Sequence, residues 1–163
     1  VAVDSGQSLT LRLGDEDYAI DIMRVQEIRS YEEPTRMANS PIFIKGVINL
    51  RGKIVPVVDL RERFSLGPAE DTERICIVVV QVEEPDGGSR LTGMIVDVVE
   101  EVSQFQSDDL EPPPDFGDAV DARFIVGMAK TRGQVKTLLD IDRLLGFVGH
   151  IDVRALHTRT VEL

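Results

Sequence analysis

The 163-residue sequence contains no tryptophan, two tyrosines, six phenylalanines and a single cysteine. A lone cysteine cannot form a disulfide within the chain, and Cys76 lies in an apolar run at 75–80. We therefore expect a buried, unreactive thiol in a reducing cytosol. No apolar stretch approaches the roughly 20 residues of a membrane-spanning helix. The start at 1–4 lacks the basic and apolar regions of a signal peptide, which predicts a cytoplasmic protein without direct membrane insertion.

Basic residues are also scarce. The chain has 18 lysines and arginines against 29 aspartates and glutamates, which gives a net charge of −11. Such a charge repels phosphate backbones and anionic lipid. Small β-barrels that bind oligonucleotides use aromatic side chains interleaved with basic ones. Here the aromatics lie mostly inside apolar runs, so nucleic acid is not an expected partner.

Residue patterns that support catalysis or metal binding are missing as well. Adjacent acids occur at 32–33, 100–101 and 108–109. Neighbours on a strand point to opposite faces, so these pairs are poor acid–base dyads. The acids at 15–17 lack the glycine and distal glutamate of a calcium loop, and His150 and His157 have no third ligand at metal spacing. We expect no enzyme activity, no cofactor and no metal.

The sequence is rich in alternating apolar and polar residues. Leucines alternate with polar residues at 9–13, a polar turn follows at 14–17, and the alternation resumes at 18–20. This pattern predicts a β-hairpin. Asp21 is then expected to cap a short helical turn at 22–25.

Two further β-rich runs, at 44–50 and 53–58, are joined by a tight turn at Arg51 and Gly52. Pro56 lies inside the second run. Proline cannot donate a hydrogen bond to a ladder, so this run is expected at a sheet edge or a bulge.

An internal repeat relates the two halves of the chain. Residues 43–64 match 124–145 without a gap, at a separation of 81 positions, and 25–28 align more weakly with 99–102. The six identities are Phe43 with Phe124, Ile44 with Ile125, Gly46 with Gly127, Arg51 with Arg132, Gly52 with Gly133 and Asp59 with Asp140. The glycines and the arginine suit tight turns, and the aspartate suits a helix N-cap, so these identities mark structural positions.

The repeat predicts a tandem pair of β units. We expect the first barrel unit at 9–66, the second barrel unit at 74–147 and a C-terminal tail at 148–163. Each unit has about five short strands that are too small to bury a sheet face alone. Two closed or nearly closed barrels that share a seam are therefore predicted.

Several segments closely resemble the CheW family of chemotaxis adaptors. They are Gly14–Ile22, Val25–Arg29, Phe43–Gly52, Ile54–Arg61 and Gly93–Val99. The resemblance runs from about residue 9 to 145, and the run Asn49-Leu50-Arg51-Gly52 is its most specific part. It implies an all-β fold of two tandem SH3-like or OB-like five-stranded β-barrels with short helices, in which the barrels can exchange strands.

The resemblance also implies a function. Members of the family bridge the cytoplasmic tip of a chemoreceptor and the regulatory domain of the histidine kinase CheA, which is itself CheW-like. By similarity, the receptor tip is expected in the groove between the barrels. The expected contacts are Val25, Glu27, Lys45, Gly46, Arg51, Ile54 and Val98. The kinase is expected to contact barrel ends elsewhere.

The chain differs from the family pattern in a longer loop at 83–90 and in an end, 149–163, that does not resemble the family's terminal helix. The same domain occurs inside the kinase and in adaptors fused to a receiver domain, and 163 residues leave no room for either. We therefore expect a single CheW-like domain at 1–163 that acts as a stand-alone adaptor, associated with membrane receptor arrays through its partners. The alternative is a CheW-like regulatory domain excised from a larger kinase or receiver-fused adaptor.

Overall fold

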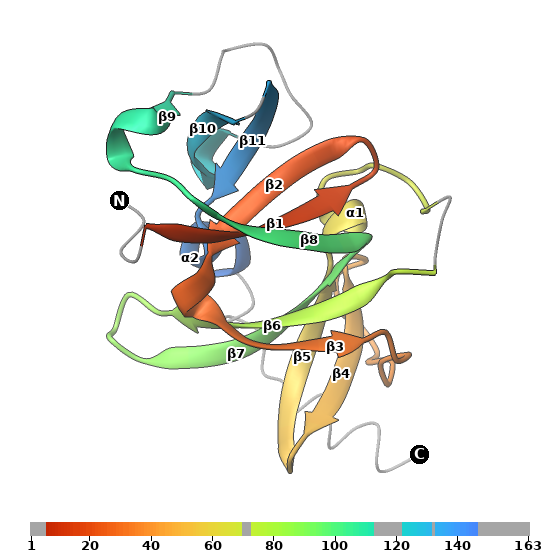
Figure 1. Ribbon diagram of the computed structural model, residues 1–163. Helices are drawn as coiled ribbons and strands as arrows, with labels where there is room; N and C mark the ends of the chain where they lie inside the picture. Colours follow the sequence, from red (N-terminus) through yellow and green to blue (C-terminus); the bar gives the residue numbers. More distant parts are fainter. Residues whose placement is uncertain (1–5, 70–72, 113–121, 132, 147–163) are drawn as a thin grey trace.

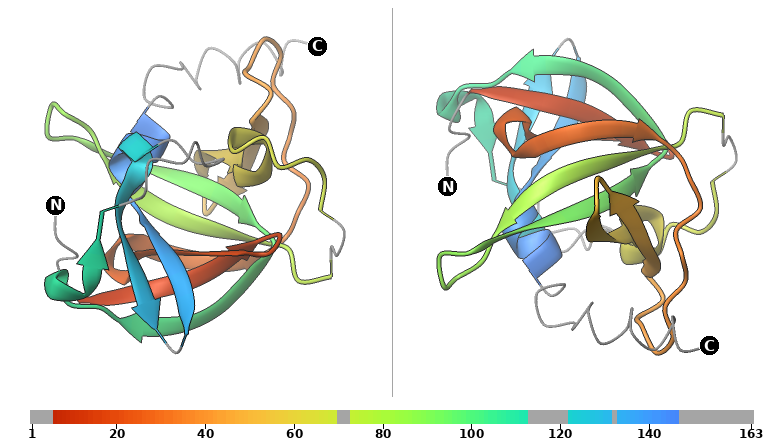
Figure 2. Two further views of the ribbon diagram at one scale, coloured as in Figure 1. Left: turned by 90° about the horizontal axis from the view of Figure 1, so that it is seen from above. Right: turned by 90° about the horizontal axis from the view of Figure 1, so that it is seen from below.

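The computed structural model describes residues 6–69, 73–112, 122–131 and 133–146, and it contains two curved β-sheets (Figures 1 and 2). The six-stranded sheet has the order β8 (Val98–Gln104), β1 (Gln7–Leu13), β2 (Glu16–Asp21), β11 (Gln134–Leu139), β10 (Ile125–Thr131) and β9 (Leu110–Glu111). The five-stranded sheet has the order β3 (Val25–Ser30), β6 (Cys76–Glu83), β7 (Ser89–Val96), β5 (Lys53–Asp59) and β4 (Ile44–Leu50). The prediction of a mainly β fold is confirmed.

The helical segments are short. They are η1 (Ile22–Arg24), α1 (Leu60–Arg63), η2 (Ser107–Asp109), η3 (Ala122–Phe124) and α2 (Ile141–Leu145). Asp21 caps η1 as expected, because its Oδ1 accepts a hydrogen bond from the Met23 amide at 3.0 Å. The predicted hairpin is confirmed too, with Leu11 of β1 opposite Tyr18 of β2.

The two sheets do not follow the two halves of the chain. The six-stranded sheet joins β1 and β2 from the first half to β8–β11 from the second, and the five-stranded sheet joins β3–β5 to β6 and β7. The stretches 9–66 and 74–147 are therefore repeats in the sequence, and each sheet takes strands from both of them, in agreement with the exchange of strands that the family resemblance implies. Alternation identifies strands without identifying their partners. The predicted tail at 148–163, Arg132 and both histidines lie outside the described residues.

The 81-residue repeat has a clear structural counterpart. The register of β4 on β5 shifts between Ile44 and Gly46, and the register of β10 on β11 shifts between Ile125 and Gly127. Each pair of strands leads into a short helix, α1 or α2, whose N-cap is the repeated aspartate. Sequence identity at these positions thus preserves a bulge and a helix cap.

The capping residues Asp59 and Asp140 donate their backbone amides to the carbonyl oxygens of Phe43 and Phe124, at 2.8 and 2.7 Å. Arg63 contacts the rings of both phenylalanines and so joins the two repeats. The guanidinium carbon of Arg63 lies 5.1 Å from the ring centre of Phe43 and 4.8 Å from that of Phe124. The cation therefore interacts with the equivalent aromatic ring of both repeats.

Pro56 does not mark a sheet edge, because β5 lies between β7 and β4. Its partner on β4 is Val47, whose own amide and carbonyl bond to Thr35 on the other side. The parallel ladder with β7 begins one residue later, at Val57. The proline thus occupies a position where a missing amide hydrogen breaks no ladder bond.

The largest apolar core lies between the two sheets. It packs β1 and β2 residues such as Leu11 and Ile20 against β6 and β7 residues such as Val80 and Met94, all fully buried. Each sheet also encloses a smaller cluster, around Val57 in the five-stranded sheet and Leu138 in the six-stranded one. Burial of each large aliphatic side chain contributes about 1.5–3 kcal/mol, so the shared core strongly favours one rigid arrangement of both sheets.

The six-stranded sheet contains a deeply buried ammonium, that of Lys136, which is 3% exposed. Its ammonium donates to Thr10 Oγ1, Ser103 Oγ and Glu101 Oε1 at 3.1, 3.1 and 3.0 Å. Three acceptors compensate for the loss of water around the cation. The equivalent residue in the five-stranded sheet, 81 positions earlier, is the buried Val55.

The chain crosses between the sheets twice, and an ion pair fixes each crossing. Between β7 and β8, the Asp97 carboxylate accepts hydrogen bonds from Arg61 Nε of α1 and from the Gly14 amide, both at 2.8 Å. Between β2 and β3, Arg24 makes two hydrogen bonds to Asp142 of α2, at 2.7 and 2.8 Å. Arg61 and Asp142 are 81 positions apart, so equivalent helical positions carry opposite charges.

These contacts change the acidity of both carboxyl groups. Burial alone would raise the pKa of Asp97, but hydrogen bonds from Arg61 and Gly14 and the guanidinium charge outweigh it and hold the pKa below its ordinary value. Asp142 shows the same balance, with Arg24 and the Glu83 amide as the partners that lower its pKa. A lowered folded-state pKa adds stability above the unfolded value of about 3.9, and that stability is lost as pH falls through the folded value.

We expect Asp97→Asn to lower the free energy of unfolding by about 2–4 kcal/mol at neutral pH, because Arg61 loses its charged partner. The variant should also lose less stability than the wild type as pH falls from 5 to 3. Urea denaturation at several pH values measures both effects. Asp108→Asn, which changes an exposed carboxylate, is the matched control. Parallel pH profiles for Asp97→Asn and the wild type would contradict the proposed role of this pair.

Candidate functional site

A groove of about 660 Å³ lies where the two sheets meet. We call it the inter-sheet groove, and its lining consists of Ile28, Arg29, Ser30, Tyr31, Glu73, Arg74, Ile75, Cys76, Val98 and Val99. The end of β3 and the start of β6 form the side from the five-stranded sheet, and the start of β8 forms the side from the six-stranded sheet. Val98 immediately follows the Asp97 crossing, so the ion pair with Arg61 helps to place it.

The groove combines an apolar lining with cationic side chains. Ile28 and Tyr31 are 47% and 46% exposed, which is high for apolar side chains. Arg29 pairs with Glu32 at 3.2 Å, whereas Arg74 is exposed and makes no hydrogen bond or ion pair within the part of the chain that the structure describes. Cys76 is half-buried rather than fully buried, and burial raises the pKa of its thiol.

Two of the expected receptor-contact residues, Glu27 and Arg51, form an ion pair. Arg51 Nη1 lies 3.3 and 3.4 Å from the two carboxylate oxygens of Glu27. Arg51 is in the left-handed region, with φ 50°, in the turn between β4 and β5, and its side chain is 73% exposed. The pair therefore connects β3 to the β4–β5 turn and presents a cation at the surface.

Ile54 lies close to this turn and is 38% exposed. It lines a second hollow, the β5 hollow, of about 390 Å³, together with Gln26 of β3 and Lys53. Val25 points elsewhere, because it is half-buried, pairs with Val80 and packs against the core between the sheets. The Val25 side chain therefore packs mainly against the core at the start of β3 and contributes little to the surface.

Gly46 has a structural role. Its φ is +143°, and a Cβ atom built on it would lie 2.0 Å from the Thr35 carbonyl oxygen. That contact is far shorter than any van der Waals distance, and the oxygen belongs to backbone that bonds to Val47. A side chain at this position would therefore push the Thr35 backbone away from β4, the strand with which it pairs. Gly46 stays an expected receptor contact, and the close approach that the structure shows at this glycine is to backbone of the same chain.

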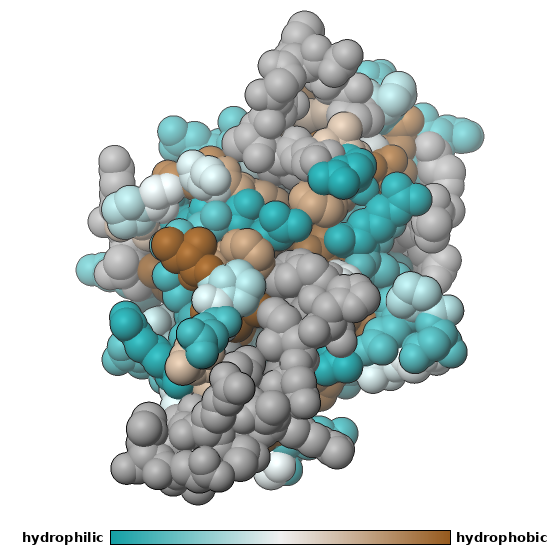
Figure 3. All heavy atoms as spheres, turned by 180° about the vertical axis from the view of Figure 1, so that it is seen from behind, coloured by the Kyte–Doolittle hydropathy of each residue, from teal (hydrophilic) through white to brown (hydrophobic). Residues whose placement is uncertain are grey.

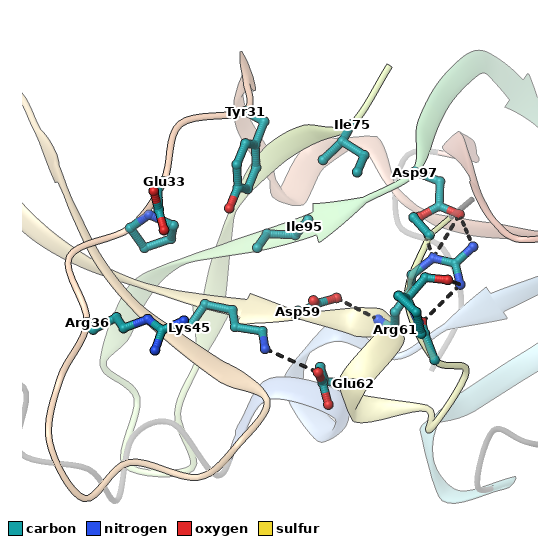
Figure 4. A pocket seen from close by; sticks show the side chains of 14 residues that line it. Tyr31, Glu33, Arg36, Lys45, Asp59, Arg61, Glu62, Ile75, Ile95 and Asp97 are labelled. Carbon is teal, nitrogen blue, oxygen red and sulfur yellow. Dashed lines mark hydrogen bonds and ion pairs between the residues drawn. The ribbon is translucent and has the colours of Figure 1, made fainter. Parts of the chain in front are cut away.

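Lys45 lies in a third hollow, the charged hollow, of about 440 Å³ (Figure 4). Its ammonium is 3.2 Å from Glu62 Oε1, and Asp59 and Asp97 are at the same hollow. Burial raises the pKa of Asp59, which is only partly offset by the hydrogen bond from the Arg61 amide. Tyr31 and Ile75 line both this hollow and the inter-sheet groove, so the two are contiguous.

The seven expected residues therefore do not line one groove. Val98 lies in the inter-sheet groove, Glu27 and Arg51 form a surface pair, Ile54 lines the β5 hollow and Lys45 lines the charged hollow. All three hollows contain residues of β3 or of the loop that follows it, which makes this segment the common element of the candidate site.

The sequence analysis missed Ile28, Tyr31 and Arg74. Ile28 follows the apolar alternation, but alternation does not show which face of an edge strand stays open. On the rear face, Figure 3 shows hydrophobic patches among hydrophilic residues. Within the described ranges, no helix is long and apolar enough to span a bilayer, and no three histidine, cysteine or acidic side chains are grouped to bind a metal ion.

The fold consists of two small SH3-like barrels that share a core, and open hollows lie along β3. Such a fold defines a binding scaffold. Comparison with known proteins identifies it further. The model of the CheW-like domain family matches residues 7–148. The chain is 39% identical over 137 residues to the chemotaxis protein CheW of Klebsiella aerogenes, with 84% of this chain and 80% of that protein covered.

A second relative, the chemotaxis protein CheW of Rhizobium meliloti, is 34% identical over 134 residues, which cover 82% of this chain and 83% of that protein. The crystal structure of the scaffolding protein TtCheW from Thermoanaerobacter tengcongensis matches with a TM-score of 0.75 and 34% identity, covering 85% of this chain and 86% of that one. The chain belongs to the CheW-like domain family and is a chemotaxis coupling scaffold. These names favour it over the alternative of a domain from a kinase or receiver-fused adaptor.

We expect Gly46→Ala to lower the free energy of unfolding by about 3 kcal/mol or more, because the new Cβ would overlap the Thr35 carbonyl. Gly52→Ala is the matched control. Its φ is +86°, and a Cβ there would meet no atom within 4 Å, so only the backbone strain of about 1 kcal/mol remains. Chemical denaturation of both variants measures the difference. Equal losses would show that the close approach at Thr35 is unimportant.

Proposed function

We propose that this scaffold couples the cytoplasmic tips of chemoreceptors to the regulatory domain of the CheA histidine kinase. In this role it is cytoplasmic and associates with membrane receptor arrays through its two partners. It works without chemical turnover and requires no cofactor. Similarity to proteins named for chemotaxis and scaffolding supports the proposal.

The observation that carries the proposal is the inter-sheet groove, which offers partly exposed apolar side chains along β3 and β8. Protein interfaces combine an apolar centre with a polar rim. Ile28 and Val98 provide such a centre, and Glu27, the neighbour of Ile28 on β3, pairs with Arg51 of the β4–β5 turn outside the groove lining. We assign the receptor tip to this surface.

The kinase regulatory domain is proposed to bind elsewhere, at barrel ends away from β3. A coupling protein must hold both partners at once, so one groove cannot serve both. The two contacts should therefore be separable by mutation. Arg51 is the best probe of the receptor contact, since its side chain is exposed and replacing it leaves the core intact.

We expect Arg51→Glu to weaken binding of a receptor tip fragment by at least ~2 kcal/mol, or roughly 30-fold. The reversed charge also repels Glu27, at 3.3 Å in the wild-type pair. Binding to the kinase regulatory domain and the melting temperature should stay near normal. Isothermal titration with each partner, beside a thermal melt, measures all three quantities.

The double variant Glu27→Arg with Arg51→Glu separates two explanations. If the receptor contacts Arg51 directly, the swapped ion pair leaves affinity low. Recovered affinity would mean that the pair acts through the geometry of β3 alone. Unchanged receptor binding by Arg51→Glu would exclude this residue from the contact, and equal loss of both partners would show that the two surfaces overlap.

A further inference from the structure

We infer that the receptor segment entering the inter-sheet groove carries a carboxylate beside its apolar side chains, and that Arg74 binds this carboxylate. The inference rests on the proposed function, because it specifies the chemistry of the partner that the groove accepts. It is carried by three features of the groove: its apolar lining, its charge and one arginine that has no partner among the residues that the structure describes.

The lining determines the apolar part of the partner. Ile28, Ile75 and Val98 approach the groove from β3, from the residue before β6 and from β8, so the apolar surface spans both sheets. Ile28 is almost half exposed, and its contact with water is unfavourable unless a partner covers it. An apolar stripe on the partner is therefore the first requirement.

The charges determine the polar part. Arg29 and Arg74 line the groove with one acid, Glu73, although the whole chain has a net charge of −11. With Glu32, the partner of Arg29, counted as well, the groove is close to neutral on an acidic protein, so an acidic segment meets less repulsion here than elsewhere on the surface. An acidic segment can therefore bind here.

Arg74 is the specific contact. The charge of Arg29 is already compensated by Glu32 at 3.2 Å. Arg74 makes no hydrogen bond or ion pair with any described residue, and its side chain is exposed at the groove. A guanidinium binds a carboxylate through two parallel hydrogen bonds, so a partner carboxylate gains both charge pairing and fixed orientation.

Cys76 provides an independent measurement. It is the single cysteine of the chain, it lines the groove and it is half-buried. A segment that occupies the groove should shield its thiol. The rate at which a small maleimide modifies Cys76 therefore reports occupancy of the groove without using affinity.

The test uses the full chain and a soluble receptor tip fragment. We expect Arg74→Glu to raise the Kd for the fragment at least about 10-fold and Arg74→Lys to raise it less, since lysine keeps the charge without the bidentate geometry. Lys130→Glu, which changes an exposed side chain of β10, is the control for an equal change of net charge and should leave the Kd unchanged. The fragment should slow Cys76 modification in the wild type, and the melting temperature of Arg74→Glu should match the wild type.

Failure of the inference differs from failure of the proposed function. If the fragment binds the wild type but Arg74→Glu binds equally well, the carboxylate contact does not exist, while receptor coupling stands. Protection of Cys76 by the kinase regulatory domain, and not by the receptor fragment, would assign the groove to the kinase and overturn the inference. No binding of the fragment to the wild type would remove the proposed function and this inference together.

Discussion

The exchange of strands between the two halves is the constraint on which the rest of the structure depends. Neither half can complete a sheet, since β1 and β2 need β8, β10 and β11, and β6 and β7 need β3, β4 and β5. The Arg24–Asp142 and Arg61–Asp97 pairs fix the two crossings, and the core between the sheets closes over both. Local folding of one half is therefore stabilised only when the other half is in place, which makes the domain one cooperative unit.

The inter-sheet groove is a consequence of this exchange. Its residues come from β3 and β8, the equivalent edge strands that follow the two crossings, and from the start of β6. An edge strand keeps one side unpaired, which leaves surface open for a partner. The Arg61–Asp97 pair helps to fix the start of β8, so a contact beside the groove helps to set the position of Val98. The same contacts that hold the fold together thus shape the candidate binding surface.

The sequence predicted local structure well and long-range pairing poorly. Alternation located the β1–β2 hairpin, and the repeated Asp59 and Asp140 were found to cap α1 and α2 as expected. Strand partners were not predictable, because apolar periodicity is the same whichever strand lies alongside. Gly46 stays a predicted receptor contact, and the structural reason for a glycine there, the approach of the Thr35 backbone, appears only in three dimensions. Lys136 was missed because a buried lysine has no sequence pattern of its own.

The two barrels share one plan but differ in charge. Equivalent bulges occur in β3, between Val25 and Glu27, and in β8, between Val99 and Glu101. The bulge residue of the first, Gln26, bonds to a neutral amide at 3.2 Å, whereas that of the second, Glu100, pairs with Arg12 at the same distance. The interiors of the two sheets also differ in charge, because residue 55 is an apolar valine and residue 136 is a lysine with a buried ammonium. The proposed function requires two unlike faces for two partners, and two similar barrels with different charges provide them within one fold.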